Sequence, residues 1–164
     1  MSNAEFGWQS LLHTDAPPAC PLQAALFTTY DRADERLLAE HLLPRLLRLS
    51  REPDGEGAER QYFLLELDRR LKQLHDRLVV VSSTAREEPA DAEEGESATY
   101  GWVWRSVRHL TVGRRGKAVQ HAKLWLLHWG PPDADGVERL EIVVSSANLT
   151  RAAFRGQLQA AWRA

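Results

Sequence analysis

Two side chains that could attack and hold a phosphodiester lie two residues apart in the sequence, and a third follows at the end of the next apolar run. They are His121, Lys123 and Asn148. A neutral imidazole can attack phosphorus with its lone pair and form a phosphoamidate intermediate. A lysine ammonium can hold a non-bridging oxygen of the phosphoryl group as a point charge. The asparagine amide adds a hydrogen-bond donor, so this set predicts attack on a phosphodiester without a metal ion.

A predicted β-hairpin carries these residues. Two β-prone runs of equal length, 121–129 and 140–148, flank a segment with two prolines and two aspartates, which is typical of a turn. The simplest antiparallel closure pairs the last residue of the first run with the first residue of the second. His121 then lies opposite Asn148 on one face of the sheet, because directly opposed side chains share a face. A slip of one residue would move Asn148 to the other face.

The same closure places Ser146 opposite Lys123, where its hydroxyl could donate a further hydrogen bond to the phosphoryl group. The leaving oxygen still needs a proton from a general acid. No second histidine occurs in a similar context; the others are His13, His41, His75, His109 and His128. The site that this sequence predicts is therefore incomplete by itself.

The elements before the hairpin alternate between strands and helices. In order, we expect a strand at 23–30, a helix at 35–49, a short apolar run at 62–67, a short basic helix at 68–77 and a buried strand at 78–83. Asp31 and Asp34 are candidate N-caps of the first helix, and Pro44 predicts a kink or an early end. The alternation favours an α/β fold, with a mixed β-sheet flanked by helices.

Charge is divided sharply along the second half of the chain. Acidic residues gather between Arg86 and Glu96, which predicts a solvated, mobile loop at about 86–98. From 97 to 132 no acidic residue occurs, and basic residues alternate with tryptophans. They are Arg105, Arg108, Arg114, Arg115, Lys117 and Lys123, with Trp102, Trp104, Trp125 and Trp129. Such a stretch can hold a polyanion and stack its bases, so Arg114, Arg115 and Lys117 are candidate substrate-binding residues. Alternatively, the tryptophans belong to the core and the arginines to a solvated face.

Length and composition set wider limits. The chain has 164 residues and a net charge of −2, which predicts one domain, 1–164, and no global attraction to nucleic acid or membrane. Its single cysteine, Cys20, favours a reducing compartment. No apolar run is long enough to span a bilayer, and no signal pattern precedes the first strand. We expect a cytoplasmic protein with no membrane partner, no metal and no cofactor.

The hairpin and the residues after it resemble the half-motif of the phospholipase D superfamily, most closely its tyrosyl-DNA phosphodiesterase branch. The matching positions are His121, Lys123, Asn148, Leu149, Phe154, Gln159 and Trp162. The segment 26–47 is similar to the opening strand and helix of that fold. The resemblance implies one half of a pseudo-two-fold fold, with His121 as nucleophile or as its general-acid partner. It also implies that Lys123, Asn148 and Gln159 bind the scissile phosphate.

Three positions depart from the superfamily pattern. His128 stands where the broader superfamily has an aspartate, which is expected for the tyrosyl-DNA phosphodiesterase branch. Ser145 stands where the family usually has a glycine, and Ala153 where it has an aspartate. The family joins two half-motifs, and this chain has one. The second would come from a homodimer or from a missing C-terminal half, and the run 157–164, which reads as a strand just beginning, favours the missing half.

Three functions remain open from the sequence. The first is phosphodiester hydrolysis through a phosphohistidine, on nucleic acid or on a 3′-DNA adduct. The second is a non-catalytic nucleic-acid-binding module that retains a relic half-site. The third is hydrolysis of a phospholipid headgroup, which the lack of a membrane-binding amphipathic stretch disfavours.

Overall fold

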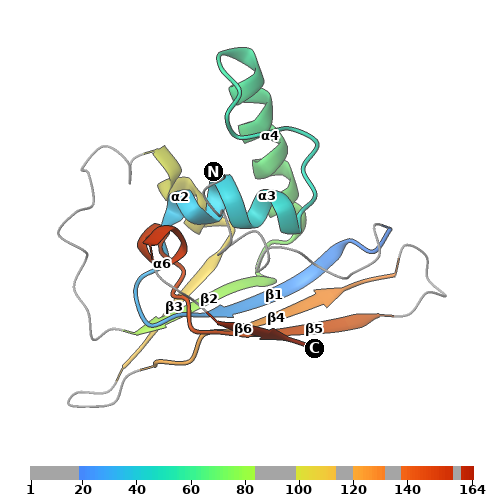
Figure 1. The fold of residues 1–164 in the computed structure, drawn as a ribbon. Coiled ribbons are helices and arrows are strands. Elements are labelled where there is room, and N and C mark those ends of the chain that lie inside the picture. The colour runs from blue at the N-terminus through green and yellow to red at the C-terminus, as the bar shows by residue number, and fades with distance from the viewer. Residues whose placement is uncertain (1–18, 84–98, 114–119, 132–137, 157–159) are drawn as a thin grey trace, which may run out of the picture.

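A six-stranded mixed sheet forms the base of the molecule, as Figure 1 shows for the computed structural model, which describes residues 19–83, 99–113, 120–131, 138–156 and 160–164. Across the sheet the strand order is β3-β2-β1-β4-β5-β6. β1, β2 and β3 are parallel, and β4, β5 and β6 continue the sheet in antiparallel pairs. The strands are β1 (Leu22–Thr28), β2 (Leu78–Ser83), β3 (Arg108–Val112), β4 (Leu124–Trp129), β5 (Arg139–Ser145) and β6 (Ala161–Arg163).

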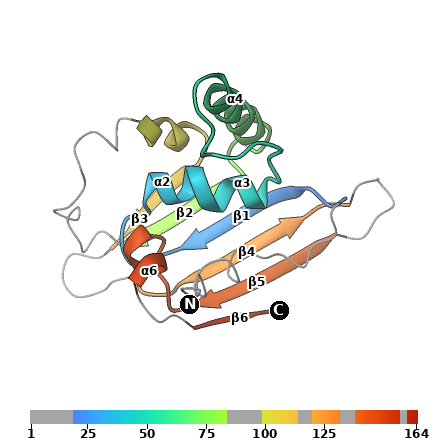
Figure 2. The same ribbon diagram turned by 45° about the horizontal axis from the view of Figure 1, so that its top comes forward.

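The labelled helices lie on one side of this sheet (Figures 1 and 2). The helical elements are α2 (Glu35–Leu37), the π-helical turn η1 (Leu38–Leu42), α3 (Leu43–Leu46), α4 (Ala58–Gln73), the 3₁₀ helix η2 (Gly101–Arg105) and α6 (Arg151–Gly156). The expected α/β class, a mixed sheet flanked by helices, is confirmed. The predicted acidic loop at 86–98 lies outside the described residues.

The first helical segment begins at the predicted cap. Asp34 accepts a hydrogen bond from the Leu37 N–H through Oδ1, at 3.0 Å, and so satisfies one of the free donors of the first turn. The predicted kink is a π-helical turn immediately before α3, in which the Leu43 N–H reaches back to the Leu38 carbonyl. Pro44 is the second residue of α3 and has no N–H to continue the helical hydrogen bonds, which explains the irregular turn before it.

The basic helix predicted at 68–77 is present, but its bounds were wrong, because it ends at Gln73 and also includes the apolar run at 62–67. The apolar run and the basic helix expected there belong to one helix, α4, which begins at Ala58. Its buried residues, Phe63, Leu67 and Leu71, recur every four positions, which gives one apolar stripe along a helix. A short apolar run cannot be distinguished from part of such a stripe when it is read alone.

The four tryptophans of the stretch from 97 to 132 belong to the core or pack against it. Trp125 and Trp129 have no exposed surface, and Trp102 and Trp104 are partly buried against the same cluster. The core forms between the sheet and its helices, with Phe27 packed edge-on against Trp125 at 5.7 Å between ring centroids. The alternative that assigned the four tryptophans to the core is therefore confirmed.

The hairpin between β4 and β5 forms, but its predicted register was wrong by one residue. Trp129 pairs with Arg139 rather than with Leu140. This register places Glu141, which has no exposed surface, on the same face as Trp129. The Trp129 indole donates to Glu141 Oε2 at 3.0 Å, and Arg163 of β6 forms an ion pair with Oε1 at 3.0 Å. The slipped register therefore gives the buried Glu141 carboxylate a hydrogen-bond donor and a positive counter-charge.

Candidate active site

The candidate site lies at the edge of the sheet where β1 and β2 end and β4 begins. His121 and Lys123 precede β4 instead of lying within it. Thr28 holds this segment against the end of β1, because its hydroxyl donates to the Ala122 carbonyl at 2.9 Å and accepts from the Leu124 N–H at 2.8 Å. The carboxyl ends of the parallel strands β1 and β2 meet at the same edge, which is where α/β sheets commonly bind ligands.

Lys123 is a nearly buried cation, with 9% of its surface exposed. Its Nζ lies 3.1 Å from the His121 carbonyl and 3.3 Å from His121 Nδ1. No carboxylate among the described residues forms an ion pair with it. A buried ammonium is ordinarily paired with an acid, so the position is one where an anion would be favoured.

His121 is exposed, and one side of its ring lies against Tyr30. The two ring centroids are 5.0 Å apart, with the rings tilted by 47°. When Lys123 is charged, its contact with Nδ1 requires that nitrogen to act as the acceptor, so the proton of a neutral ring is on Nε2. In the neutral ring Nε2 therefore carries the N–H, and the ring lone pair on Nδ1 faces Lys123.

Asn148 is anchored to the residues that follow β1. Its Oδ1 accepts from the Tyr30 N–H at 3.1 Å and from the Thr29 hydroxyl at 3.4 Å, and its Nδ2 donates to Asp31 at 2.8 Å. An amide nitrogen carries two hydrogens, and no described residue accepts the second one. Tyr30 therefore links the two predicted site residues, since its backbone binds Asn148 and its ring packs on His121.

Ser145 takes the place opposite Lys123 that was predicted for Ser146, because of the shifted register. The Ser145 N–H donates to the Lys123 carbonyl at 2.9 Å. Ser146 is exposed, and its hydroxyl accepts from the Ala160 N–H at 2.9 Å. Four further candidate residues lie outside the described part of the chain: Arg114, Arg115, Lys117 and Gln159.

Sequence reasoning missed the residues at the end of β1 that hold the site together. Thr28, Thr29, Tyr30 and Asp31 each contact the 121–124 segment or Asn148. One signal was available, because this polar stretch follows directly after an apolar strand. Polar residues at the carboxyl end of a buried strand are a common source of site residues in α/β proteins.

A separate serine–histidine pair lies on β2 and β3. Ser82 Oγ is 2.8 Å from His109 Nε2, and the His109 ring stacks on Trp104 at 4.9 Å. Burial lowers the pKa of His109, and the charge of Arg32 lowers it further, against an opposing effect of Glu35. Ser82 is 1% exposed, so this pair is closed to a substrate and is structural.

The described residues contain no cluster of three or more histidine, cysteine or acidic side chains able to hold a metal ion. Within the same part of the chain, no helix has the length and apolar character needed to cross a bilayer.

Comparisons with known proteins found little. No family model matches the chain, and no curated protein matches it. One solved structure that matches is a mutant of the yeast tyrosyl-DNA phosphodiesterase, at 15% identity and a TM-score of 0.42. The match covers 87% of this chain and 25% of that one, so this chain spans about a quarter of the length of that protein.

Proposed function

We propose that this chain supplies one half of a site for metal-independent hydrolysis of phosphodiesters through a phosphohistidine intermediate. The observation that carries the proposal is Lys123, a nearly buried ammonium whose contacts among the described residues are the His121 carbonyl and ring. A phosphoryl group placed there would supply the missing negative charge. It would also lie directly beside the imidazole that has to react with it.

In the proposed reaction, Lys123 donates to a non-bridging oxygen of the phosphodiester and releases Nδ1 of His121. An imidazole nitrogen then attacks phosphorus, so that a P–N bond forms and the P–O bond to the leaving group breaks. The leaving oxygen takes a proton from a general acid, and water later cleaves the P–N bond. The remaining amide hydrogen of Asn148 could donate to the same phosphoryl group, and we assign Ser146 and Gln159 to further contacts with it.

The second histidine of this scheme would come from a second half-motif, either in a longer chain or in a homodimer partner. His121 acts as the nucleophile or as the general acid, depending on which half holds the substrate. In the acid role the ring would be an imidazolium, which carries a proton on Nδ1 as well as on Nε2, so this role also requires Lys123 to stop donating to Nδ1. Binding of a phosphoryl oxygen to Lys123 would free the ring for the nucleophilic role.

We propose nucleic acid or a 3′-DNA adduct as the substrate. The stretch from 97 to 132 has no acidic residue, and its two described arginines, Arg105 and Arg108, are exposed. Exposed cations on such a stretch attract a polyanion. In the same proposal, Arg114, Arg115 and Lys117 bind the substrate backbone. A non-catalytic module that only binds nucleic acid, or a phospholipid hydrolase, would be distinguished by the test below.

The test is hydrolysis of a 3′-tyrosyl oligonucleotide by the full-length protein, with and without EDTA. We expect EDTA to have no effect and His121→Ala to lose about four or more orders of magnitude, because nucleophile and acid act as a unit. His128→Ala is the matched control. His128 lies near the end of β4, away from the site, and its Nε2 is 3.2 Å from the Glu138 carboxylate. Equal activity of wild type and His121→Ala, with unchanged DNA binding, would identify a binding module. Turnover of phospholipid vesicles in place of the oligonucleotide would identify a lipid enzyme.

A further inference from the structure

Two consecutive threonines at the end of β1 hold the two separate parts of the candidate active site. Thr28 is the last residue of β1, and Thr29 follows it. Successive side chains of an extended strand point to opposite faces, so the two hydroxyls reach different segments of the chain. The Thr28 hydroxyl binds the segment before β4, whereas the Thr29 hydroxyl binds the segment after β5.

The Thr28 hydroxyl takes the place of a backbone partner for the segment before β4. The backbone pairing of β1 with β4 ends one residue before Thr28. Beyond that pair, the hydroxyl donates to the Ala122 carbonyl at 2.9 Å and accepts from the Leu124 N–H at 2.8 Å. Ala122 lies between His121 and Lys123, so these two bonds fix the backbone from which both side chains project.

The Thr29 hydroxyl makes the same kind of double contact with the segment after β5. It accepts from the Leu149 N–H at 3.0 Å and donates to Asn148 Oδ1 at 3.4 Å. Thr29 has no exposed surface, and its own N–H donates to the Val81 carbonyl of β2 at 2.9 Å. The threonine that holds Asn148 is therefore itself bound to an inner strand of the sheet.

We infer that Thr28 and Thr29 are positioning residues of the hydrolytic site, an inference that rests on the proposed function. A hydroxyl can donate and accept hydrogen bonds at the same time, and each threonine uses both abilities to join one segment of the site to the end of β1. A displacement of about 1 Å of a reacting group can cost about 10²-fold in rate. These contacts can therefore govern turnover although neither threonine is assigned a contact with the substrate.

The experiment compares Thr28→Val and Thr28→Ser in the full-length protein, with the 3′-tyrosyl oligonucleotide as substrate. Valine has nearly the shape of threonine but lacks the hydroxyl, whereas serine keeps the hydroxyl. We expect Thr28→Val to lower kcat about 10–10²-fold with little change in KM, because the loss concerns the geometry of the transition state. Thr28→Ser should keep most of the wild-type kcat.

An NMR measurement tests the positioning without any activity. The imidazole nitrogen signals of His121 report which ring nitrogen carries the proton, and the side-chain amide signals of Asn148 report its hydrogen bonds. Thr28→Val should shift the His121 signals more than those of Asn148, and Thr29→Val should do the reverse. These shifts are expected even if the oligonucleotide is not a substrate, so failure of the proposed function and failure of this inference are distinguishable.

Thr111→Val is the matched control, because Thr111 is exposed on the edge strand β3, which β2 separates from β1. It should leave kcat and both sets of signals unchanged. The Ala122 carbonyl also accepts from Gln120 Nε2 at 2.8 Å, so Thr28→Val leaves this acceptor satisfied, and near-ultraviolet circular dichroism checks that each variant is folded.

Three results would overturn the inference. The first is a kcat of Thr28→Val equal to that of an active wild type. The second is a loss in Thr28→Ser as large as that in Thr28→Val, since the hydroxyl would then not be the cause. The third is an equal shift of the His121 and Asn148 signals in both valine variants, which would indicate a general change of the fold.

Discussion

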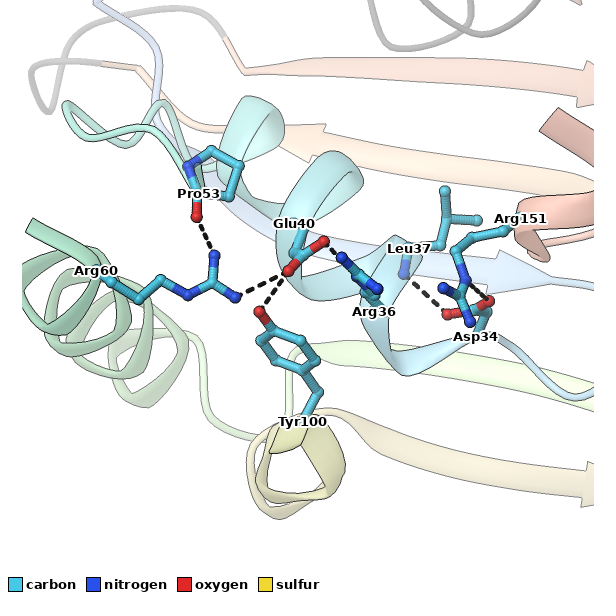
Figure 3. A network of polar contacts seen from close by, with 8 residues as sticks. All are labelled: Asp34, Arg36, Leu37, Glu40, Pro53, Arg60, Tyr100 and Arg151. Carbon is cyan, nitrogen blue, oxygen red and sulfur yellow. Dashed lines mark hydrogen bonds and ion pairs between the residues drawn. The ribbon is translucent and has the colours of Figure 1, made fainter. Parts of the chain in front are cut away.

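Two nearly buried charges in this protein have opposite surroundings. The Glu40 carboxylate, whose side chain is 10% exposed, receives Arg36 at 2.7 Å, Arg60 at 2.8 Å and the Tyr100 hydroxyl at 2.5 Å (Figure 3). The Lys123 ammonium, at 9% exposure, contacts a carbonyl and an imidazole. The fold therefore neutralises the first charge with its own groups, whereas no described residue supplies a carboxylate to the second.

The Glu40 network is explained by the packing of helices. Glu40 lies in η1, Arg60 in α4, and Tyr100 directly before η2, so one carboxylate ties together three elements (Figure 3). Arg60 also donates to the Pro53 carbonyl. A partly buried network whose members are all satisfied stabilises one arrangement of its elements. No such explanation applies to Lys123, since its partners lie on its own segment.

The largest expected effect is on catalysis. Lys123→Ala should lower the rate of phosphodiester hydrolysis by the full-length protein about 10²–10³-fold, because one charge-stabilising contact in the transition state is removed. Glu40→Gln should leave the turnover of the folded enzyme unchanged. Steady-state rates of both variants on the same 3′-tyrosyl oligonucleotide make the comparison. If Glu40→Gln lost as much activity as Lys123→Ala, the distinction between the two charges would fail.

The second effect is on stability, where we expect the loss of the Glu40 charge to matter more than the loss of the Lys123 charge. Glu40→Gln should lower the free energy of unfolding by about 2–3 kcal/mol, because two arginines lose their carboxylate partner. The matched control is Glu66→Gln, whose carboxylate accepts only from Ser50 among the described residues and should contribute less than about 1 kcal/mol. Urea unfolding of the variants measures both changes. Equal losses in the two variants would contradict a special role for Glu40.

The third effect is the contribution of Lys123 to the stability of the folded protein. Lys123→Met should leave the free energy of unfolding unchanged or raise it by up to about 1 kcal/mol, because a charge without a counter-ion is replaced by an apolar chain of similar volume. Phosphate or vanadate should raise the Tm of wild type, since a ligand of the native state stabilises it, and should affect Lys123→Met less. A large loss of stability in Lys123→Met would show that the fold itself needs this ammonium.

The smallest effect comes from His109, a half-buried base whose pKa is lowered in the fold. Burial and Arg32 lower its pKa in the native state, so the unfolded chain takes up a proton there before the native protein does. The stability that His109 contributes is present above its unfolded pKa and is lost as pH falls through the lowered folded value. Urea unfolding between pH 7.5 and 5.5 should therefore depend less steeply on pH in His109→Gln. An unchanged slope would contradict this.

The sequence predicted those parts of the fold that follow from local patterns. The α/β class, the strands β1 and β2 and the Asp34 cap follow from apolar runs and from residues next to them. The register of β4 on β5 does not, because it depends on Glu141 finding Trp129 and Arg163 within the folded sheet. The length of α4 was missed because its stripe contains a run that is also typical of a strand.

In the candidate site, too, some features follow from local sequence patterns and others depend on distant parts of the chain. The spacing of His121 and Lys123 drew attention to the segment before β4. The partners supplied by the end of β1 come from a distant part of the chain, and no local pattern links Asn148 to Tyr30 or Asp31. The roles proposed for Gln159, Arg114, Arg115 and Lys117 stay predictions.

The central position of β1 has a consequence for the protein during its synthesis. β1 pairs with β2 on one side and with β4 on the other, and Phe27 meets Trp125 across the second pairing. Roughly a hundred residues separate these partners, so at about 5–20 residues per second the ribosome needs on the order of 5–20 s to supply the second edge. During that time an apolar strand has an open edge, which can pair with other chains. We expect the yield of native protein to fall when translation between β2 and β4 is slowed.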